Sequence, residues 1–138
     1  MNTKKLEWEE KYSVGVKELD DQHKQLFAVI NELLDAIDSN KTKERIDIII
    51  NGLVEYKTFH FETEEKYFKK FNYKEAEDHI AKHKEFNAKF EALRKKYPNG
   101  YTVEFSFELA DFLEDWLINH LMTLDQEYKE CFASHGLK

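Results

Sequence analysis

Apolar side chains recur every three to four residues through four long segments of this chain, the period of helices that bury one face. The segments cover about residues 19–38, 43–71, 74–96 and 104–131. Only four glycines and one proline occur in 138 residues, which leaves few positions for the many turns of a β fold. The pattern therefore predicts an all-α protein.

Short breaks separate the four predicted helices. Ser39-Asn40 follows the first, Asn72 the second and Pro98-Asn99-Gly100 the third. Because short connections place successive helices side by side and antiparallel, we expect an up-down-up-down four-helix bundle. Residues 1–18 show no sustained period and are expected to form an extended N-terminal arm on a single domain that spans residues 1–138.

Charge and cysteine content restrict the partners and the compartment. The 21 basic and 28 acidic side chains give a formal net charge of -7, which argues against nucleic acid and anionic membranes as partners. The single cysteine, Cys131, forms no internal disulfide, which suits a reducing compartment. The N-terminus lacks the apolar core of a signal peptide, so we expect a cytoplasmic protein. Exposed faces rich in Lys and Glu favour a monomer.

Titratable residues interrupt the apolar stripes where a plain bundle would have Leu or Ile. They are His23, His60, Glu64, His79, His83 and His120. Burying one such side chain without a partner destabilises a fold by about 1–3 kcal/mol. Six of these penalties would approach the whole stability of a small domain, about 5–15 kcal/mol. A shared metal site would satisfy them together, because neutral imidazole and ionised carboxylate are good ligands.

The spacing of these residues supports chelation from single helix faces. His60 and Glu64 are four residues apart, so they lie one above the other on one helix, and His79 and His83 repeat this arrangement on the next. The remaining two histidines can complete the ring from the first and fourth helices.

Asp125 is a further candidate with an irregular spacing. It follows His120 by five residues, a rotation of about 140° on an ideal helix, so the two would not stack. Either the helix widens locally, as π-type bulges do at functional sites, or Asp125 enters from a displaced turn. The spacing alone ranks Asp125 below the other six candidates.

Ordinary structural roles compete with the metal site. A single inward histidine is more often a hydrogen-bonded core residue, and Glu64 alone could pair with a lysine. The coincidence of five histidines on the core stripes of four helices favours a metal cluster. The sixth histidine, His135, lies in a glycine-containing tail, and we expect no role for it.

The donor set restricts the metal. Five histidines and two carboxylates are too many ligands for one ion. If both carboxylates and an oxo or hydroxo group bridge two octahedral ions, one coordination position stays open. Imidazole and carboxylate with an open position suit iron, whereas structural zinc would use cysteine. Ferritin-type sites need Glu three residues before His. The corresponding residues here are Lys57, Ala76, Ile80 and Leu117.

Several motifs resemble those of the hemerythrin family, and most closely those of the single-domain bacterial hemerythrins (bacteriohemerythrins). The matching segments are Ser13-Val14-Gly15-Val16, Leu19-Asp20-Asp21-Gln22-His23, His60-Phe61-Glu62-Thr63-Glu64-Glu65, His79-Ile80-Ala81-Lys82-His83 and Trp116-Leu117-Ile118-Asn119-His120 through Asp125. The resemblance spans nearly the whole chain. One departure is Phe68, which stands where the family often has Met.

The resemblance implies a division of the ligands between two iron ions. One iron would be bound by His79, His83 and His120, and the other by His23 and His60. Glu64 and Asp125 would bridge the two ions together with an oxo or hydroxo group. The iron with two histidines would carry the open position at which dioxygen binds reversibly.

Apolar residues within a helical turn of the ligands are expected to line the dioxygen site. They are Leu26, Phe61, Trp116, Leu117 and Leu121. We expect Leu26, Phe61 and Leu117 in particular to keep water out, although ordinary core packing explains each residue equally well on its own.

Three functions are compatible with such a cluster. The first is reversible dioxygen binding for carriage, storage or delivery. The second is an enzyme that acts on peroxide or nitric oxide or oxidises a substrate, and the third is an oxygen or iron sensor that works through a partner. Catalysis would benefit from a titratable group beside the open position. The apolar pocket candidates offer none, so we expect a binding protein and not an enzyme.

Overall fold

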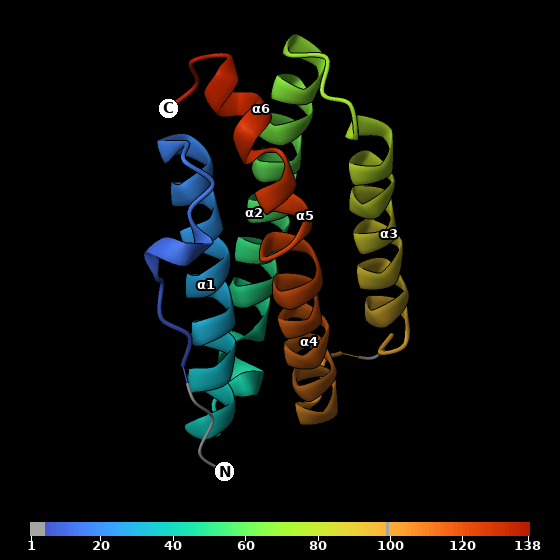
Figure 1. The fold of residues 1–138 in the computed structure, drawn as a ribbon. Coiled ribbons are helices and arrows are strands. Elements are labelled where there is room, and N and C mark those ends of the chain that lie inside the picture. The colour runs from blue at the N-terminus through green and yellow to red at the C-terminus, as the bar shows by residue number, and fades with distance from the viewer. Residues whose placement is uncertain (1–4, 99) are drawn as a thin grey trace.

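The computed structural model describes residues 5–98 and 100–138. It is all-helical, with no strand among these residues. The elements in chain order are η1 (Glu10–Tyr12), α1 (Lys17–Asp38), α2 (Thr42–Lys70), α3 (Ala76–Lys95), α4 (Val103–Trp116), the π-helical segment η2 (Leu117–Leu121), α5 (Leu124–Glu127) and α6 (Lys129–Ser134). The four long helices α1 to α4 form the body of the molecule (Figure 1).

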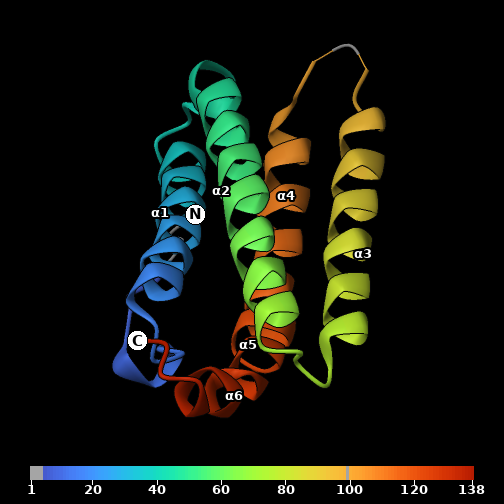
Figure 2. The same cartoon turned by 90° about the horizontal axis from the view of Figure 1, so that it is seen from above.

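Successive helices run antiparallel, as the short connections predict. The α1–α2 and α3–α4 connections lie at one end of the bundle and the α2–α3 connection lies at the other (Figure 2). Each long helix packs against the next, and α4 returns to α1, which closes the four-helix bundle. Among the described helices, none combines the length and the apolar character needed to cross a membrane.

Two asparagines end the first two long helices. Asn40 after α1 has φ 58° and Asn72 after α2 has φ 51°, the left-handed conformation that Asn adopts more readily than most side chains. At the start of α4, the Thr102 hydroxyl accepts a hydrogen bond from Phe105 N at 3.2 Å. The bundle therefore turns where the sequence places its capping residues.

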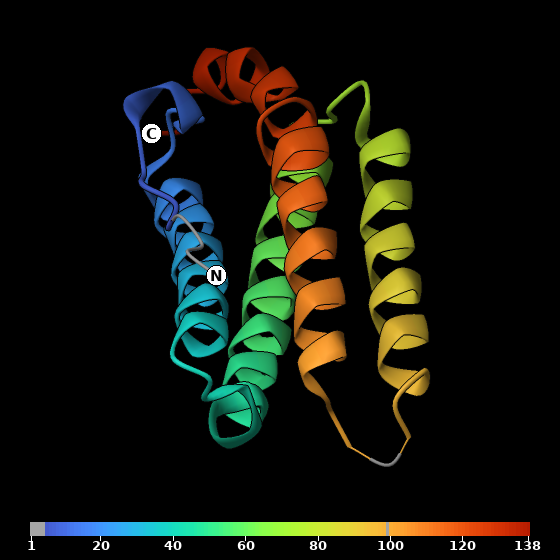
Figure 3. The ribbon, with the colours of Figure 1, turned by 90° about the horizontal axis from the view of Figure 1, so that it is seen from below.

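Hydrogen bonds attach the N-terminal arm to the bundle at several points. Asn31 of α1 accepts a hydrogen bond from Leu6 N at 2.7 Å and donates one to Leu6 O at 2.9 Å. Gln126 of α5 donates to Tyr12 O at 3.0 Å. The arm runs along α1, and its last residues lie at the same end of the bundle as α6 (Figure 3).

The fourth helix differs from the continuous segment expected over 104–131. α4 ends at Trp116 and continues as the π-helical segment, in which Met122 N donates to Leu117 O at 3.0 Å. Thr123 then leaves helical geometry with φ -123° and ψ -72°. The widened turn adds a residue to the helix, so the chain bends and resumes as the short helices α5 and α6.

The buried apolar residues form two clusters. The larger one occupies the long part of the bundle and includes Leu26, Phe61 and Phe86. The smaller one lies under the arm and α6. Its members are Val14, Val16, Leu19, Tyr67, Phe68, Tyr73, Tyr128 and Phe132. On α1 and α2 the residues between the two clusters are polar, so a polar layer separates them.

Candidate metal centre

All seven candidate ligands lie in this polar layer, and all are at most 2% exposed. They are His23 on α1, His60 and Glu64 on α2, His79 and His83 on α3, His120 in the π-helical segment and Asp125 on α5. The apolar stripe of each helix faces the bundle interior, so the polar residues within the stripes are turned inward with it.

The seven side chains form two groups that share one residue. Glu64 lies with His79, His83 and His120 in the first group, and with His23, His60 and Asp125 in the second. Within each group the potential ligand atoms all lie within 4.8 Å of one another. The histidines are divided between the groups as the family resemblance implies.

Each carboxylate directs one oxygen to each set of histidines. Glu64 Oε1 lies 3.0 Å from His83 Nε2, whereas its Oε2 lies 3.3 Å from His60 Nε2. Asp125 repeats this arrangement. Asp125 Oδ1 lies 3.0 Å from His79 Nε2 and 3.1 Å from His120 Nε2. Asp125 Oδ2 lies 3.1 Å from His23 Nε2. The two carboxylates are therefore placed to bridge two ions.

Many potential ligand atoms in this layer lie close to one another but form no hydrogen bond of acceptable geometry among the described residues. They are the Nε2 atoms of His23, His60, His79 and His120, both ring nitrogens being unpaired in His23 and His120, and both oxygens of Asp125. Leaving such buried atoms unpaired is unfavourable by about 1–3 kcal/mol each. Imidazole nitrogens and carboxylate oxygens converging in this way suit metal ions that accept their lone pairs.

The electrostatics of the layer keep both carboxylates ionised. Burial raises the pKa of Glu64, but its interactions with His60 and the other histidines outweigh this effect and hold that pKa well below its ordinary value. The pKa of Asp125 is also lowered, because His120 and His23 outweigh burial and the charge of Glu64. Two anionic bridging groups are therefore available to cations.

His79 responds in the opposite direction. Burial lowers its pKa, but the neighbouring carboxylates of Asp125 and Glu64 raise it to about 10. In the metal-free protein this imidazole is protonated at neutral pH. A metal ion must therefore displace a proton from His79, which couples metal binding to pH.

The π-helical segment accounts for the position of Asp125. Both alternatives left open by the five-residue spacing occur here, since the helix widens at Leu117–Leu121 and Asp125 enters from the displaced turn α5. Asp125 is fully buried as a result.

Three hydrogen-bond partners of the candidate ligands were not predicted from the sequence. His60 Nδ1 lies 2.8 Å from Gln22 Oε1, and His83 Nδ1 lies 2.8 Å from Glu65 Oε2. Tyr128 donates a hydrogen bond to Glu64 Oε2 at 2.6 Å. Gln22 and Glu65 are next to ligands in the sequence but reach histidines on neighbouring helices, so no period reveals them. Of the three, only Tyr128 could be inferred from the sequence, because it lies one helical turn after Asp125.

Two of the five predicted apolar lining residues stack on candidate ligands. Leu26, Leu117 and Leu121 are buried. The Phe61 ring stacks on His83 with centroids 3.9 Å apart, and the half-buried Trp116 stacks on His120 at 3.8 Å. These two aromatic rings therefore cover histidines of the first group.

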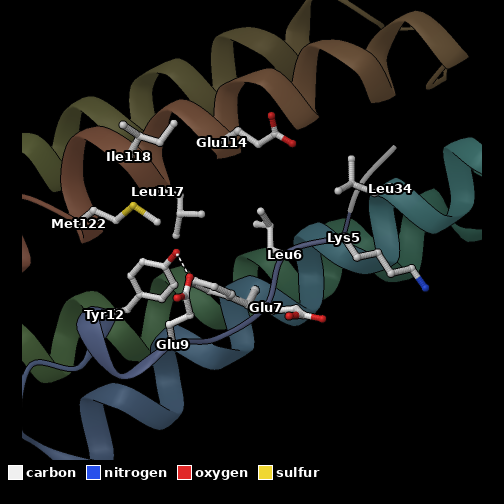
Figure 4. Close-up of a pocket in the computed structure, with 11 residues that line it drawn as sticks. Lys5, Leu6, Glu7, Glu9, Tyr12, Leu34, Glu114, Leu117, Ile118 and Met122 are labelled. Atoms are coloured by element: carbon white, nitrogen blue, oxygen red, sulfur yellow. Dashed lines mark hydrogen bonds between the residues drawn. The ribbon is translucent and has the colours of Figure 1, made fainter. Parts of the chain in front are cut away.

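Leu117 also faces a cavity between the arm and α4. The cavity has a volume of about 840 Å³, and Tyr12, Phe27, Ile118 and Met122 are among its other lining residues. Figure 4 shows Leu117 directed toward Leu6 and Tyr12 across this space. Leu117 thus lines this cavity, three residues before the candidate ligand His120.

Tyr56 is another neighbour that the stripes alone did not single out as part of the site. Its ring stacks on His60 with centroids 5.2 Å apart, and its side chain is buried. Burial and the nearby carboxylates of Asp125 and Glu64 raise the pKa of Tyr56 well above its ordinary value. Tyr56 therefore keeps its proton at neutral pH.

Known proteins are similar to this chain over most of its length. The family model for the hemerythrin HHE cation binding domain matches residues 14–132. A bacteriohemerythrin of Clostridium acetobutylicum is 29% identical over 124 residues, which cover 88% of this chain and 96% of the relative. A myohemerythrin-1 of Phascolopsis gouldii is 32% identical over 123 residues, which cover 88% and 90%. A hemerythrin-like protein of Naegleria gruberi is 31% identical over 122 residues, which cover 88% and 89%.

Proposed function

Because this chain belongs to the hemerythrin family, we propose that it binds dioxygen reversibly at a non-haem di-iron centre, for oxygen carriage, storage or delivery. Membership in the family supports a metal-binding, oxygen-related role. The observation that carries the finer proposal is the pair of buried ligand groups that share Glu64. Two iron ions bound there would supply the two electrons that reversible dioxygen binding requires.

The proposed ligand assignment follows the two groups. His79, His83 and His120 would hold one iron, and His23 and His60 the other. Glu64 and Asp125 would bridge both ions, together with an oxo or hydroxo group, because each carboxylate directs its two oxygens to different sets of histidines. The ion with fewer histidines would have the open position.

The surroundings favour binding over catalysis. The proposed pocket residues Leu26, Leu117 and Leu121 are apolar and buried, so they exclude water and offer no proton. Tyr56 lies against His60, but its raised pKa makes it a poor acid at neutral pH. A catalyst of peroxide or nitric oxide reduction would need a group that releases protons more readily.

Optical spectroscopy of the reduced, iron-loaded protein tests this function directly. We expect a charge-transfer band to appear on addition of dioxygen and to bleach when the gas is removed, over repeated cycles. The metal-free chain is the control and should show no band. Irreversible oxidation in the first cycle, or continuous consumption of added peroxide, would contradict reversible binding.

Leu117 is expected to protect the centre from water. Leu117→Ala removes a buried side chain that lines the arm cavity, three residues before His120. We expect this variant to keep its iron but to autoxidise faster, about tenfold or more, because water gains access. The decay of the oxygenated spectrum at fixed temperature measures the rate.

Leu109→Ala is a matched control for this variant. Leu109 is a fully buried leucine on α4, two turns before the π-helical segment. Both substitutions create a cavity and are expected to lower the free energy of unfolding by about 2–5 kcal/mol. Only the change at Leu117 should accelerate autoxidation. Equal rates in the two variants and the unmodified chain would show that Leu117 does not shield the centre.

A further inference from the structure

A chain of hydrogen bonds connects the backbone of α2 to the ring of His60. The Thr63 hydroxyl donates to Phe59 O at 2.7 Å. Gln22 of α1 donates from Nε2 to Thr63 Oγ1 at 3.1 Å. Gln22 Oε1 lies 2.8 Å from His60 Nδ1. The chain crosses from one helix to the next and back, and it ends on a candidate ligand.

The direction of each hydrogen bond in this chain follows from the previous one. Thr63 has one hydroxyl proton, which the Phe59 carbonyl accepts, so toward Gln22 the hydroxyl can only accept. Gln22 must therefore present its NH₂ group to Thr63 and its carbonyl oxygen to His60. Because a carbonyl oxygen cannot donate, the proton of this contact belongs to His60 Nδ1, and in the neutral imidazole Nε2 then keeps its lone pair.

We propose that Gln22 and Thr63 are positioning residues that hold His60 with its proton on Nδ1 and its Nε2 lone pair directed at the metal. This proposal rests on the proposed function, since it concerns how a ligand of that same centre is oriented. His60 is fully buried and Nε2 lies 3.3 Å from Glu64 Oε2. Without this chain of hydrogen bonds from Phe59 O through Thr63 and Gln22, here called the relay, the proton could move to Nε2 and block coordination.

A comparison with His83 explains why two residues are needed to orient His60. His83 Nδ1 faces the carboxylate of Glu65 at 2.8 Å, and both oxygens of a carboxylate accept hydrogen bonds. An amide can present either oxygen or nitrogen to its neighbour. Gln22 therefore directs His60 only if something fixes the amide, and Thr63 is placed to do so.

The relay is tested in the iron-loaded, reduced protein with Thr63→Val, which keeps the side-chain shape and removes the hydroxyl. We expect iron release to a chelator to become about tenfold faster, since removing outer partners of a ligating histidine weakens metal binding by about 10–100-fold. We also expect the Nδ1 proton of His60, observed by NMR, to exchange faster with solvent.

Two further variants separate positioning from a general structural role. Thr63→Ser restores the hydroxyl and should restore both slow iron release and slow proton exchange. Thr58→Val makes the same substitution at an exposed threonine of α2 and should change neither. Thr63→Val behaving as the unmodified chain would overturn the proposal, and so would a failure of Thr63→Ser to restore it.

Failure of the proposed function can be told apart from failure of the relay. If the unmodified chain takes up no iron, the di-iron function is wrong, but the proton on His60 can still be located in the metal-free chain by long-range ¹H–¹⁵N correlation. A proton on Nδ1 alone, redistributed in Thr63→Val, supports the relay. A proton on Nε2 in the unmodified chain contradicts it.

Discussion

Glu64→Gln is expected to leave the chain unable to retain a pair of iron ions. Glu64 belongs to both ligand groups, and its oxygens approach His83 Nε2 at 3.0 Å and His60 Nε2 at 3.3 Å. A glutamine has one oxygen and no charge, so it can serve at most one of the two ions, and its NH₂ group repels the other. We expect less than about half of the iron of the unmodified chain to remain, since a carboxylate is a far better ligand than an amide.

The measurement is iron content per chain after anaerobic loading and desalting. Glu62→Gln is the matched control, because it makes the same substitution at an exposed glutamate of α2 and should retain the full content. Circular dichroism should show that both variants remain helical. A Glu64→Gln protein with as much iron as the unmodified chain would exclude Glu64 as a bridging ligand.

Iron loading is expected to raise the melting temperature strongly. A ligand at a thousand times its dissociation constant stabilises the folded state by about 4 kcal/mol. For a domain of 138 residues, that corresponds to an increase on the order of 10–20 °C. Thermal unfolding followed by circular dichroism, with and without iron, measures the difference. The Glu64→Gln protein should show little increase, which separates specific binding from a general effect of the metal salt.

The size of this increase should depend on pH through His79. In the metal-free fold its pKa is raised from 6.5 to about 10, so the protonated ring stabilises that fold fully below pH 6.5 and loses this effect as pH rises through 10. Metal binding needs the neutral ring. The iron-dependent rise in melting temperature should therefore be larger at about pH 8 than at about pH 6. An increase that is constant or smaller at the higher pH would contradict this linkage.

The first three long helices, the start of the fourth and the burial of six of the seven candidate ligands could be predicted because they follow one period. Histidines on the apolar stripes of α1 to α3 face inward whenever those stripes do, as the burial of His23 and His83 illustrates. Asp125 could not be placed by periodicity, because its approach depends on a π-type hydrogen bond that no residue type demands. Only the family resemblance assigned it a role in advance.

The contacts between helices could not be predicted from the sequence for a different reason. Gln22 and Glu65 act on histidines of adjacent helices, so their roles depend on the relative rotation and height of two helices. A periodic pattern fixes which face is buried but not which residues of two faces meet. The stacking of Phe61 on His83 could not be predicted for the same reason.

The extra residue within Leu117–Leu121 has a consequence for protein design. Bundles assembled from ideal helices, with identical rise and rotation at every step, place residues five apart about 140° around the axis. Such a scaffold could accept His120 but would turn Asp125 away from it. The same irregularity redirects the chain into α6, which carries Phe132 into the apolar cluster at the bundle end. A design that copied the ligands but used regular helices would lose both the Asp125 carboxylate and the packing of Phe132 at the bundle end.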